Sequence, residues 1–489
     1  MPRLLPRLRR SPTLATPGLR APGTAANHPP GDRPAVARPP RASRAAVRAA
    51  IAVALLAPAL FVAQNAGATG FVPLPPRPVG QRSARPTAPT PVSGAVTFYG
   101  RGNGHGVGLS QYGARGRADA GQLAPAILAH YYPGTTLGTL AAGKGIRVLV
   151  LEKRAVTAAG PLVIHGRLGT WKIDTIAATF PADAALRLAP TVSGGTVTWR
   201  LRVVASDGTE LFNGPPPVPL RARPATGSIA VLQLDTKPSS FDRFRGVLRV
   251  IASTTAATVD VVNELPLETY LQGVVASEMP STWHPQALRA QAIVARGYAA
   301  RRITTSGTFD VYDDTRSQVY RGVLGEQKTT TDAITATATQ VLKFGTTIAN
   351  TLFHSTGGAA TENNENVFVS ATGNIVVSPV SYLRGSVDRK PDGTPYDASS
   401  PWMAWQTKTY SVAQLSAWFG SDGRTSVGTL TAIDLRRRGV SGRLIGITLI
   451  GTAGSKSVSG DVFRSVFNAS KPAADPILRS NNFDVAPIR

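Results

Sequence analysis

The sequence contains no cysteine among its 489 residues. This absence excludes disulfide bonds, thiolate nucleophiles and cysteine-ligated zinc. Methionine occurs three times and histidine six times, and acidic residues are outnumbered by basic ones, 28 against 53. A folded chain of this composition must be stabilised by burial of apolar side chains, and its length allows two or three domains with sizeable cores.

The N-terminal 68 residues have the pattern of an export signal. Residues 1–48 carry ten arginines and a single acid, Asp32, and an uncharged run follows from Ala49 to Ala68. The apolar part of this run is short for a membrane span and ends in Ala66-Gly67-Ala68. We therefore predict a signal peptide with a long basic leader over residues 1–68, cleaved after Ala68. An uncleaved membrane anchor is the alternative.

Residues 69–94 are rich in proline and predict an extended linker. Without the leader the chain keeps a net charge of about +16. In an exported protein this charge favours anionic wall polymers or anionic lipid head groups as surroundings and argues against nucleic acid as a partner. We expect a secreted protein associated with the cell wall.

The rest of the chain divides into three stretches. Residues 95–140 contain "YGRGNGHGVGLSQYGARG" and a predicted helix near 123–131. Residues 146–238 consist of short alternating stretches between turn residues, which predict a β-rich module. From 239 to 489 the pattern is mixed and includes two predicted helices, within 263–302, joined by a tight corner. The predicted class is α+β.

The sequence lacks the motifs typical of several classes of enzyme and nucleotide-binding protein. The glycine-rich stretch fits neither G-x-G-x-x-G nor a P-loop, and "GLSQYG" does not fit the G-x-S-x-G elbow of serine hydrolases. The sequence has no H-E-x-x-H. We predict no cofactor and no metal, although a zinc site formed by His105, His354 and a carboxylate is kept as an alternative.

Glu278 is the candidate catalytic residue. It lies at the corner "ASEMPSTW", where the apolar neighbours Met279, Pro280 and Trp283 disfavour the charged carboxylate and would raise its pKa. The start of the following helix opposes this shift, because its positive end favours the anion. The alternative is a surface or capping glutamate.

Four blocks in series resemble one family. "LPLETYLQGVVASEMPSTWHPQALRAQAIVARGYAARR" is similar to the core signature of the stage II sporulation protein D / amidase enhancer (SpoIID/LytB) family. "DDTRSQVYRGV" (313–323), "NTLFHSTGGAATENNENVF" (350–368) and "SGRLIGITLIG" (441–451) resemble its later blocks, in the same order.

The resemblance implies a SpoIID-like domain over 239–489, with a mixed or antiparallel sheet and a helical pair carrying the active-site corner. The "GHGVGxSQYGA" block ordinarily closes this domain, whereas here it comes first. We therefore interpret 95–140 as a permuted segment that folds back beside the chain's end. The β-rich module 146–238 is then interpreted as an inserted or linking module.

The resemblance also implies a function. We expect a lytic transglycosylase that cleaves peptidoglycan glycan strands between N-acetylmuramic acid and N-acetylglucosamine, with Glu278 as general acid and base. The predicted substrate contacts are His105, Ser110, Gln111, Tyr112, Asp314, Gln318, His354 and Ser355, whereas Tyr298 and Tyr320 are predicted to be core residues.

Two other functions remain open. The first is a non-catalytic wall-binding enhancer whose partner is an N-acetylmuramoyl-L-alanine amidase, as the enhancer branch of the family implies. The second is a hydrolase that uses water, with Asp313 or Asp314 as its second carboxylate.

Overall fold

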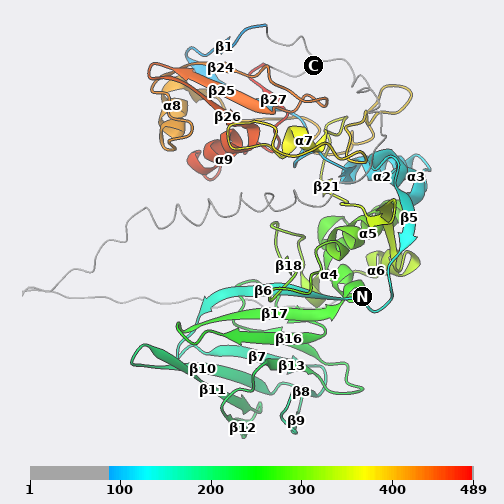
Figure 1. Cartoon of the computed structure of the whole chain (residues 1–489), viewed down its shortest axis with the longest axis vertical. Helices are drawn as coiled ribbons and strands as arrows, with labels where there is room; N and C mark the ends of the chain where they lie inside the picture. Colours follow the sequence, from blue (N-terminus) through cyan, green and yellow to red (C-terminus); the bar gives the residue numbers. More distant parts are fainter. Residues whose placement is uncertain (1–86, 487–489) are drawn as a thin grey trace, which may run out of the picture. The chain divides into compact units, whose positions relative to one another are not determined.

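The computed structural model describes residues 87–486 (Figure 1). The predicted leader and signal peptide, and the linker as far as residue 86, lie outside the described residues. The described part combines helices with mostly antiparallel sheets, so the predicted α+β class is confirmed. Within it, no helix has both the length and the apolar character needed to cross a membrane.

Thirteen of the strands in residues 87–486 belong to the two largest sheets. Their bounds are β6 (Gly145–Ala155), β7 (Leu162–Arg167), β8 (Trp171–Ile173), β9 (Thr179–Phe180), β10 (Ala185–Ser193), β11 (Thr196–Val204), β12 (Glu210–Gly214), β13 (Leu220–Pro224), β14 (Val231–Leu234), β15 (Arg243–Phe244), β16 (Val247–Ala252), β17 (Thr258–Pro266) and β18 (Val311–Tyr312). A seven-stranded sheet has the order β18-β6-β17-β16-β13-β8-β9, and a six-stranded sheet has the order β12-β11-β10-β7-β14-β15.

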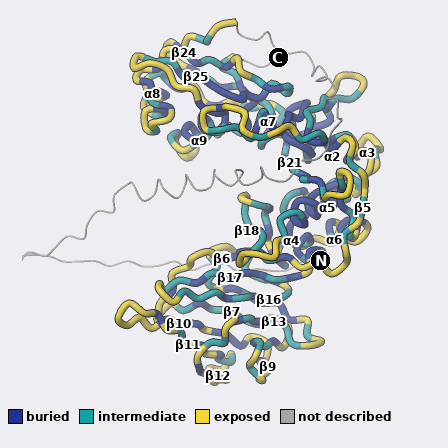
Figure 2. The backbone as a smooth tube through the Cα atoms, in the orientation of Figure 1, coloured by how far each residue is buried: buried dark blue, intermediate teal, exposed yellow. Residues whose placement is uncertain are grey.

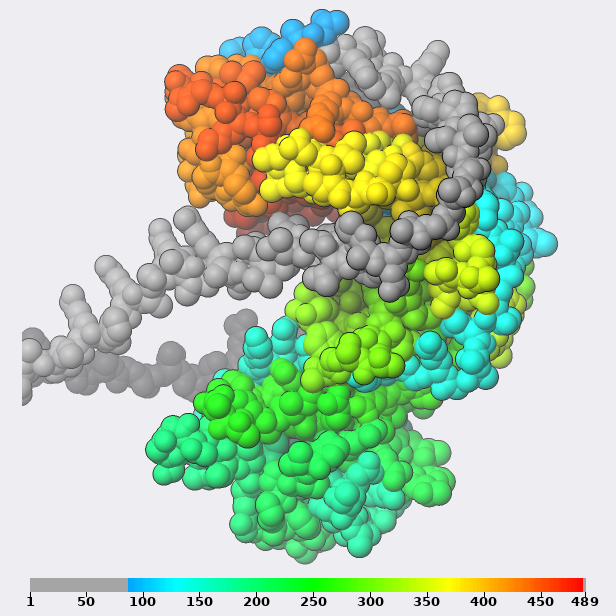
Figure 3. Space-filling view, viewed as in Figure 1, coloured from blue at the N-terminus to red at the C-terminus, as the bar shows by residue number. Residues whose placement is uncertain are grey.

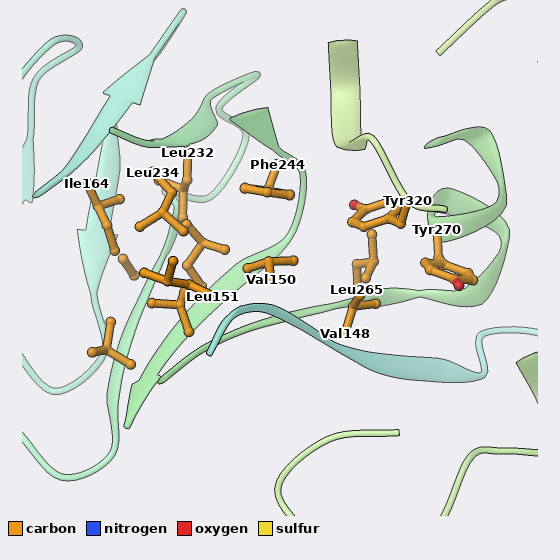
Figure 4. Close-up of a cluster of buried hydrophobic side chains, with 14 of the residues drawn as sticks. Val148, Val150, Leu151, Ile164, Leu232, Leu234, Phe244, Leu265, Tyr270 and Tyr320 are labelled. Carbon is orange, nitrogen blue, oxygen red and sulfur yellow. The ribbon is translucent and has the colours of Figure 1, made fainter. Parts of the chain in front are cut away.

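The two sheets enclose one apolar core. Alternate residues of β7 are buried, as expected for strands with one face toward a core. Ile164 of the six-stranded sheet and Leu248 of the seven-stranded sheet belong to the same cluster. Figure 4 shows that this cluster continues past Phe244 to Tyr320 and Tyr270, at the helices. The sheets therefore form a sandwich whose core extends to the helix that carries Glu278.

The sandwich extends beyond the β-rich module predicted at 146–238. Strands β15, β16 and β17 cover residues 243–266 and belong to the same two sheets. The predicted boundary at 238/239 therefore falls inside the sandwich, because β17 pairs with both β16 and β6.

The helical layer is built on α5. Its helices are α2 (Gln111–Asp119), α3 (Ala124–Tyr131), α4 (Leu267–Glu278), α5 (Pro285–Ala300), the 3₁₀ helix η2 (Gly322–Gly325) and α6 (Lys328–Ala336). Nearly every residue of α5 from Ala287 onward is buried (Figure 2). This helix packs against α2, α3, α4 and α6, so it forms the centre of the layer.

Helix α2 was not predicted from the sequence. Gly113 and Gly116 lower its helix propensity. Both glycines are required by packing, because a side chain at 113 would overlap Tyr131 and Asp388, and one at 116 would overlap the backbone of Tyr396.

A third part contains the end of the described chain. Its elements are β1 (Thr90–Pro91), β24 (Leu430–Asp434), β25 (Gly446–Gly451), β26 (Gly454–Ser459), α8 (Val412–Gly420) and α9 (Gly460–Ser470). The ring of Phe98 meets those of Phe463 and Phe467 edge-on, with centroids 5.7 and 5.4 Å away. Residues near 90 thus pack against residues above 430, as the contact of blue and orange in Figure 3 shows.

Short strands connect these parts. They are β2 (Ala95–Val96), β3 (Tyr99–Gly100), β4 (Leu109–Ser110), β5 (Thr136–Thr139), β19 (Gln340–Phe344), β20 (Thr347–Ile348), β21 (Phe353–His354), β22 (Trp405–Gln406), β23 (Tyr410–Ser411) and β27 (Phe483–Asp484), together with helix α7 (Asn364–Val367). β3 pairs antiparallel with β27, and β4 pairs parallel with β21. The glycine-rich segment therefore lies beside the end of the chain.

Candidate active site

Glu278 is the last residue of α4, at the corner that leads into α5. Met279 follows in an extended conformation with a buried side chain, and Pro280 disfavours continuation of the helix. α5 begins at Pro285, a residue suited to the first helical position. The Nδ1 atom of His284 accepts a hydrogen bond from the Gln286 amide and caps this helix. Glu278 is left half-buried at the corner.

Two segments distant in sequence contact Glu278. The Val319 amide donates a 3.0 Å hydrogen bond to Oε1, and Nε2 of Gln111 donates one of 3.0 Å to the Glu278 backbone carbonyl. Burial raises the pKa of the Glu278 carboxyl above its ordinary value, while the Val319 amide, the Gln111 amide and the charge of Arg321 act against this rise. The net shift is toward the protonated acid, the form in which a carboxyl group can donate a proton.

Residues 313–321, here called the strap, position the Val319 amide. At its start, Asp313 Oδ2 accepts a 2.6 Å ion-pair hydrogen bond from Lys237, whose side chain is only 10% exposed. Near its end, the Tyr320 hydroxyl donates to the side chain of Asn263 over 2.8 Å. Lys237 and Asn263 belong to the sandwich region, so the sandwich holds the strap against α4.

Residues 102–108, here called the glycine loop, need glycine for conformational reasons. Gly102, Gly104, Gly106 and Gly108 have φ between +71° and +94°, a region that other residues rarely adopt. At Gly106 the backbone also lies against the guanidinium of Arg443, where any side chain would overlap it.

Arg443 packs against the backbone of the glycine loop at Gly106. It is 2% exposed, and Nη2 donates to the Gly357 carbonyl over 3.0 Å. On the other side the Gly106 carbonyl accepts a 2.7 Å hydrogen bond from the Glu362 amide. The loop is therefore a rigid element built on buried polar groups.

His105 and His354 form a pair within this loop region. Their ring centroids lie 5.5 Å apart. The Val107 amide donates to Nδ1 of His105 over 3.0 Å, and His354 Nδ1 lies 3.3 Å from the Val107 carbonyl. Burial, reinforced by the charge of Arg443, lowers the pKa of His105 to about 4. Burial also lowers the pKa of His354 well below its ordinary value, so both imidazoles are neutral at pH 7.

The start of α2 joins the glycine loop to the Glu278 corner. Ser110 is the N-cap: its Oγ accepts hydrogen bonds from the amides of Gly113 (3.2 Å) and Gly357 (3.1 Å). Gln111 reaches Glu278, as described above. The ring of Tyr112 meets that of Trp283 at 4.7 Å, nearly edge-on, and its amide donates to the Ser355 carbonyl.

The predicted contact residues fall into two groups. His105, Ser110, Gln111, Tyr112, His354 and Ser355 are brought together, because β4 pairs with β21 and α2 continues from β4. Asp314 instead lies on the outer side of the strap, where it pairs with Arg316 at 2.8 Å. Gln318 is 1% exposed and bonded to the Tyr270 hydroxyl over 3.3 Å, which indicates a structural role. Tyr298 and Tyr320 are buried.

Sequence reasoning missed three contributors: the Val319 amide, Lys237 and the contact of Trp283 with Tyr112. A backbone donor carries no residue signal, and Lys237 lies within the predicted β-rich module. Trp283 was visible in the corner motif, but nothing in the sequence indicated its partner.

The two carboxylates considered as the second catalytic carboxylate of a hydrolase both form ion pairs. Asp313 is paired with Lys237, and Asp314 with Arg316. Among residues 87–486, no group of three or more histidine and acidic side chains is placed to hold a metal ion.

Comparisons with known proteins agree with these motifs. Residues 255–344 match the family model SpoIID, described as "Stage II sporulation protein". The chain is 32% identical over 222 residues to "Stage II sporulation protein D" of Bacillus subtilis (strain 168), which covers 40% of this chain and 59% of that protein. To the protein of the same name from Bacillus amyloliquefaciens it is 32% identical over 191 residues, 35% of this chain and 51% of the relative.

A third relative carries a different name. "Amidase enhancer" of Bacillus subtilis (strain 168) is 30% identical over 163 residues, 33% of this chain and 21% of that protein. The chain thus spans less than two thirds of the length of each of these relatives. No solved structure matches it. As the motifs predict, the part of the chain that includes the corner formed by Glu278 is similar to the SpoIID family model.

Proposed function

We propose that this protein cleaves the glycan strands of peptidoglycan as a lytic transglycosylase, with Glu278 as its general acid and base. The observation that carries this proposal is the environment of Glu278. Its carboxyl is half-buried with a raised pKa, held by one backbone amide, and without a salt bridge among the described residues.

The first step requires the acid form. Glu278 gives its proton to the oxygen that links N-acetylmuramic acid to N-acetylglucosamine, and the bond from this oxygen to the muramoyl C1 breaks. The Val319 amide remains on Oε1 and stabilises the carboxylate that results.

The second step uses the same side chain as a base. The Glu278 carboxylate takes the proton of the muramoyl 6-hydroxyl, whose oxygen closes on C1 to give a 1,6-anhydro sugar. The nucleophile belongs to the substrate, so no second carboxylate is needed to activate water. This chemistry is consistent with the engagement of Asp313 and Asp314 in ion pairs.

The proposal also covers the cellular location of the protein and its association with wall polymers. The export signal proposed at 1–68 would deliver the protein to the outside of the cell membrane, where its substrate lies. The excess of basic residues would keep it near anionic wall polymers.

A second candidate function is an enhancer of a cell-wall amidase that does not cleave glycan itself. It is favoured by the similarity to the protein named "Amidase enhancer". In this case Glu278 would have a structural role at the corner.

One experiment distinguishes the two. The purified protein is incubated with glycan strands, with and without stem peptides, and the products are analysed by mass spectrometry. We expect fragments ending in 1,6-anhydro-muramic acid, lost in Glu278→Gln and retained in the control Glu152→Gln, whose side chain is 41% exposed. General acid catalysis alone is worth about 10²–10⁴-fold.

The other outcomes identify the alternatives. Sugar ends that have gained water would indicate a hydrolase. An absence of fragments, combined with faster cleavage by an added amidase, would establish the enhancer. Circular dichroism of both variants checks that the corner still folds.

A further inference from the structure

Three arginines lie on the outer face of the six-stranded sheet, where β10 and β11 run side by side (Figure 1). Arg187 of β10 and Arg202 of β11 are directly opposite each other in the antiparallel pairing. Arg200 lies two positions from Arg202 on the same strand and therefore on the same face. All three residues are exposed, whereas the alternate residues Leu188 and Leu201 are buried in the sandwich core. We call the three residues the arginine strip.

The charge of the arginine strip is poorly neutralised. Among residues 87–486, Arg187 has no hydrogen-bond or ion-pair partner, and Arg200 has no ion-pair partner and donates to the side chain of Asn213 over 2.6 Å. Arg202 pairs with Glu210, but both side chains are more than one third exposed, and such a pair contributes little. Like charges opposite each other on paired strands are destabilising. The strip is therefore a surface that an anionic ligand would stabilise.

The other outer face of the sandwich provides a comparison. On the seven-stranded sheet, Arg223 pairs with Asp174 at 2.5 Å. Arg221 and Arg249 both pair with Glu264, at 2.5 and 2.6 Å. Every arginine of β13 and β16 thus has a carboxylate partner. The scarcity of carboxylates at the arginine strip is therefore a local feature and not a consequence of the basic composition.

We propose that the arginine strip is a docking site for a phosphodiester-linked wall polymer, a chain of singly charged phosphate groups. This inference goes beyond the proposed function and does not depend on catalysis by Glu278. Guanidinium groups donate paired hydrogen bonds to the non-bridging oxygens of a phosphate. Arg187 and Arg202 bind one phosphate between them, since residues opposite each other on paired strands lie about 5 Å apart at Cβ. Arg200, about 7 Å along β11, binds the next phosphate.

The surroundings of the arginine strip favour a narrow chain over a membrane surface. Farther across the same face, Asp183 pairs with Arg167 and Asp235 pairs with His165. A flat anionic bilayer would be brought against these carboxylates, and like charges repel. A polymer that follows β10 and β11 avoids them. The export signal proposed at 1–68 would also place this face among wall polymers.

The test measures binding of the purified full chain to fluorescein-labelled poly(glycerol phosphate) by fluorescence anisotropy. The test variant is Arg187→Gln/Arg200→Gln, because neither side chain has a carboxylate partner among the described residues that the change would leave unpaired. The control is Arg221→Gln/Arg223→Gln, which removes the same charge from the other face of the sandwich. We expect Kd to rise at least about tenfold in the test variant and less than about threefold in the control.

Stability measurements separate binding from folding. Removal of one arginine of the facing pair relieves repulsion, so the Tm of Arg187→Gln should equal or exceed that of the parent. A lower Tm would assign a structural role to Arg187 and overturn the proposal. The proposal is also overturned if the parent does not bind the polymer, or if Arg187→Gln and the test variant both bind it as tightly as the parent.

Two further ligands distinguish the polymer from other polyanions. Polygalacturonate carries carboxylates in place of phosphates, and equimolar vesicles of phosphatidylcholine and phosphatidylglycerol present phosphates on a membrane. We expect both to bind less tightly than poly(glycerol phosphate). Polygalacturonate bound as tightly would overturn the choice of phosphate. Vesicle binding that depends on Arg187 and Arg200 more strongly than polymer binding does would overturn the polymer in favour of a membrane.

This proposal and the proposed function fail independently. On purified glycan strands, which carry no phosphodiester polymer, Arg187→Gln/Arg200→Gln should release anhydro-ended fragments at the parental rate. Glu278→Gln should bind poly(glycerol phosphate) with the parental Kd. If fragments form and the polymer does not bind, the docking site is wrong and the transglycosylase stands. If the polymer binds through the arginine strip and no fragments form, the transglycosylase is wrong and the docking site stands.

Discussion

The backbone amide of Val319 donates to Oε1 of Glu278 over 3.0 Å, although the two residues lie 41 positions apart. A backbone donor cannot be removed by substitution of its own side chain. Its effect on the Glu278 carboxyl must therefore be tested through the residues that hold the strap. The Gln111 side chain, which also acts on the pKa of Glu278, can be substituted directly.

Gln111→Ala should raise the pKa of Glu278 further, because the Gln111 amide favours the charged carboxylate. The alkaline limb of the pH–activity profile reports loss of the acid form, so it should move to higher pH. One hydrogen bond is worth about 1 kcal/mol, which corresponds to a shift of about 0.7 pH units. The control is Gln122→Ala, whose side chain is bonded to the Tyr396 hydroxyl. An unmoved limb in Gln111→Ala would contradict this assignment.

Lys237→Met should loosen the strap. It leaves Asp313, 17% exposed, without its cation, and breaking such a pair costs about 3 kcal/mol of unfolding free energy. Urea denaturation measures this loss. Lys328→Met is the control, because its pair with Asp332 is exposed and should contribute no more than about 0.5 kcal/mol. Adding Asp313→Asn to Lys237→Met should recover part of the stability, and no recovery would argue against the ion pair.

Stability should fall as the pH is lowered from 6.5 to about 4. The folded-state pKa of His105 lies near 4, below its ordinary value of 6.5. The unfolded chain therefore binds more protons within this window, and stability rises with pH across it. The contribution of His105 is roughly 3 kcal/mol. In His105→Asn, which keeps an acceptor for the Val107 amide, urea midpoints measured from pH 4 to 7 should vary less. An equal slope would show that His105 does not carry the effect.

Gly106→Ala should lower the free energy of unfolding much more than Gly143→Ala. Both Gly106 and Gly143 have positive φ, +86° and +73°. Only at 106 would the added Cβ overlap a buried group, the Arg443 guanidinium, whereas nothing lies within 4 Å of it at 143. We expect about 1 kcal/mol for Gly143→Ala and at least about 3 kcal/mol for Gly106→Ala. Thermal unfolding of both variants measures the difference.

The sequence predicted those parts of the site that depend on neighbouring residues. The corner between α4 and α5 could be predicted because Pro280 disfavours continuation of α4 and Pro285 suits the start of α5. Ser110, the N-cap of α2, was also present in the sequence, but Gly113 and Gly116 lower the helix propensity and α2 was not predicted. Glycine is needed at these positions because a side chain would overlap Tyr131 or the backbone of Tyr396, which are distant in sequence.

Contacts between distant segments could not be predicted in this way. The link from Gln111 to Glu278 spans 167 positions, and the pair of Lys237 with Asp313 spans 76. The order of the family blocks indicated that the glycine-rich segment returns to the chain's end, but not which side chain would make the contact. Asp314 and Gln318 match the same blocks, yet one faces outward and the other is buried.

The pairing of β3 with β27 has a consequence for biosynthesis. The amides of Arg101 and Gly104 donate to the carbonyls of Asn482 and Arg479, and the Ser480 hydroxyl donates to the carbonyl of Arg101. The ribosome makes the glycine-rich stretch early, but these acceptors come almost four hundred codons later. A nascent polypeptide that stops before these residues lacks the acceptors, so the glycine-rich stretch completes its pairing only after residue 482 has been synthesised.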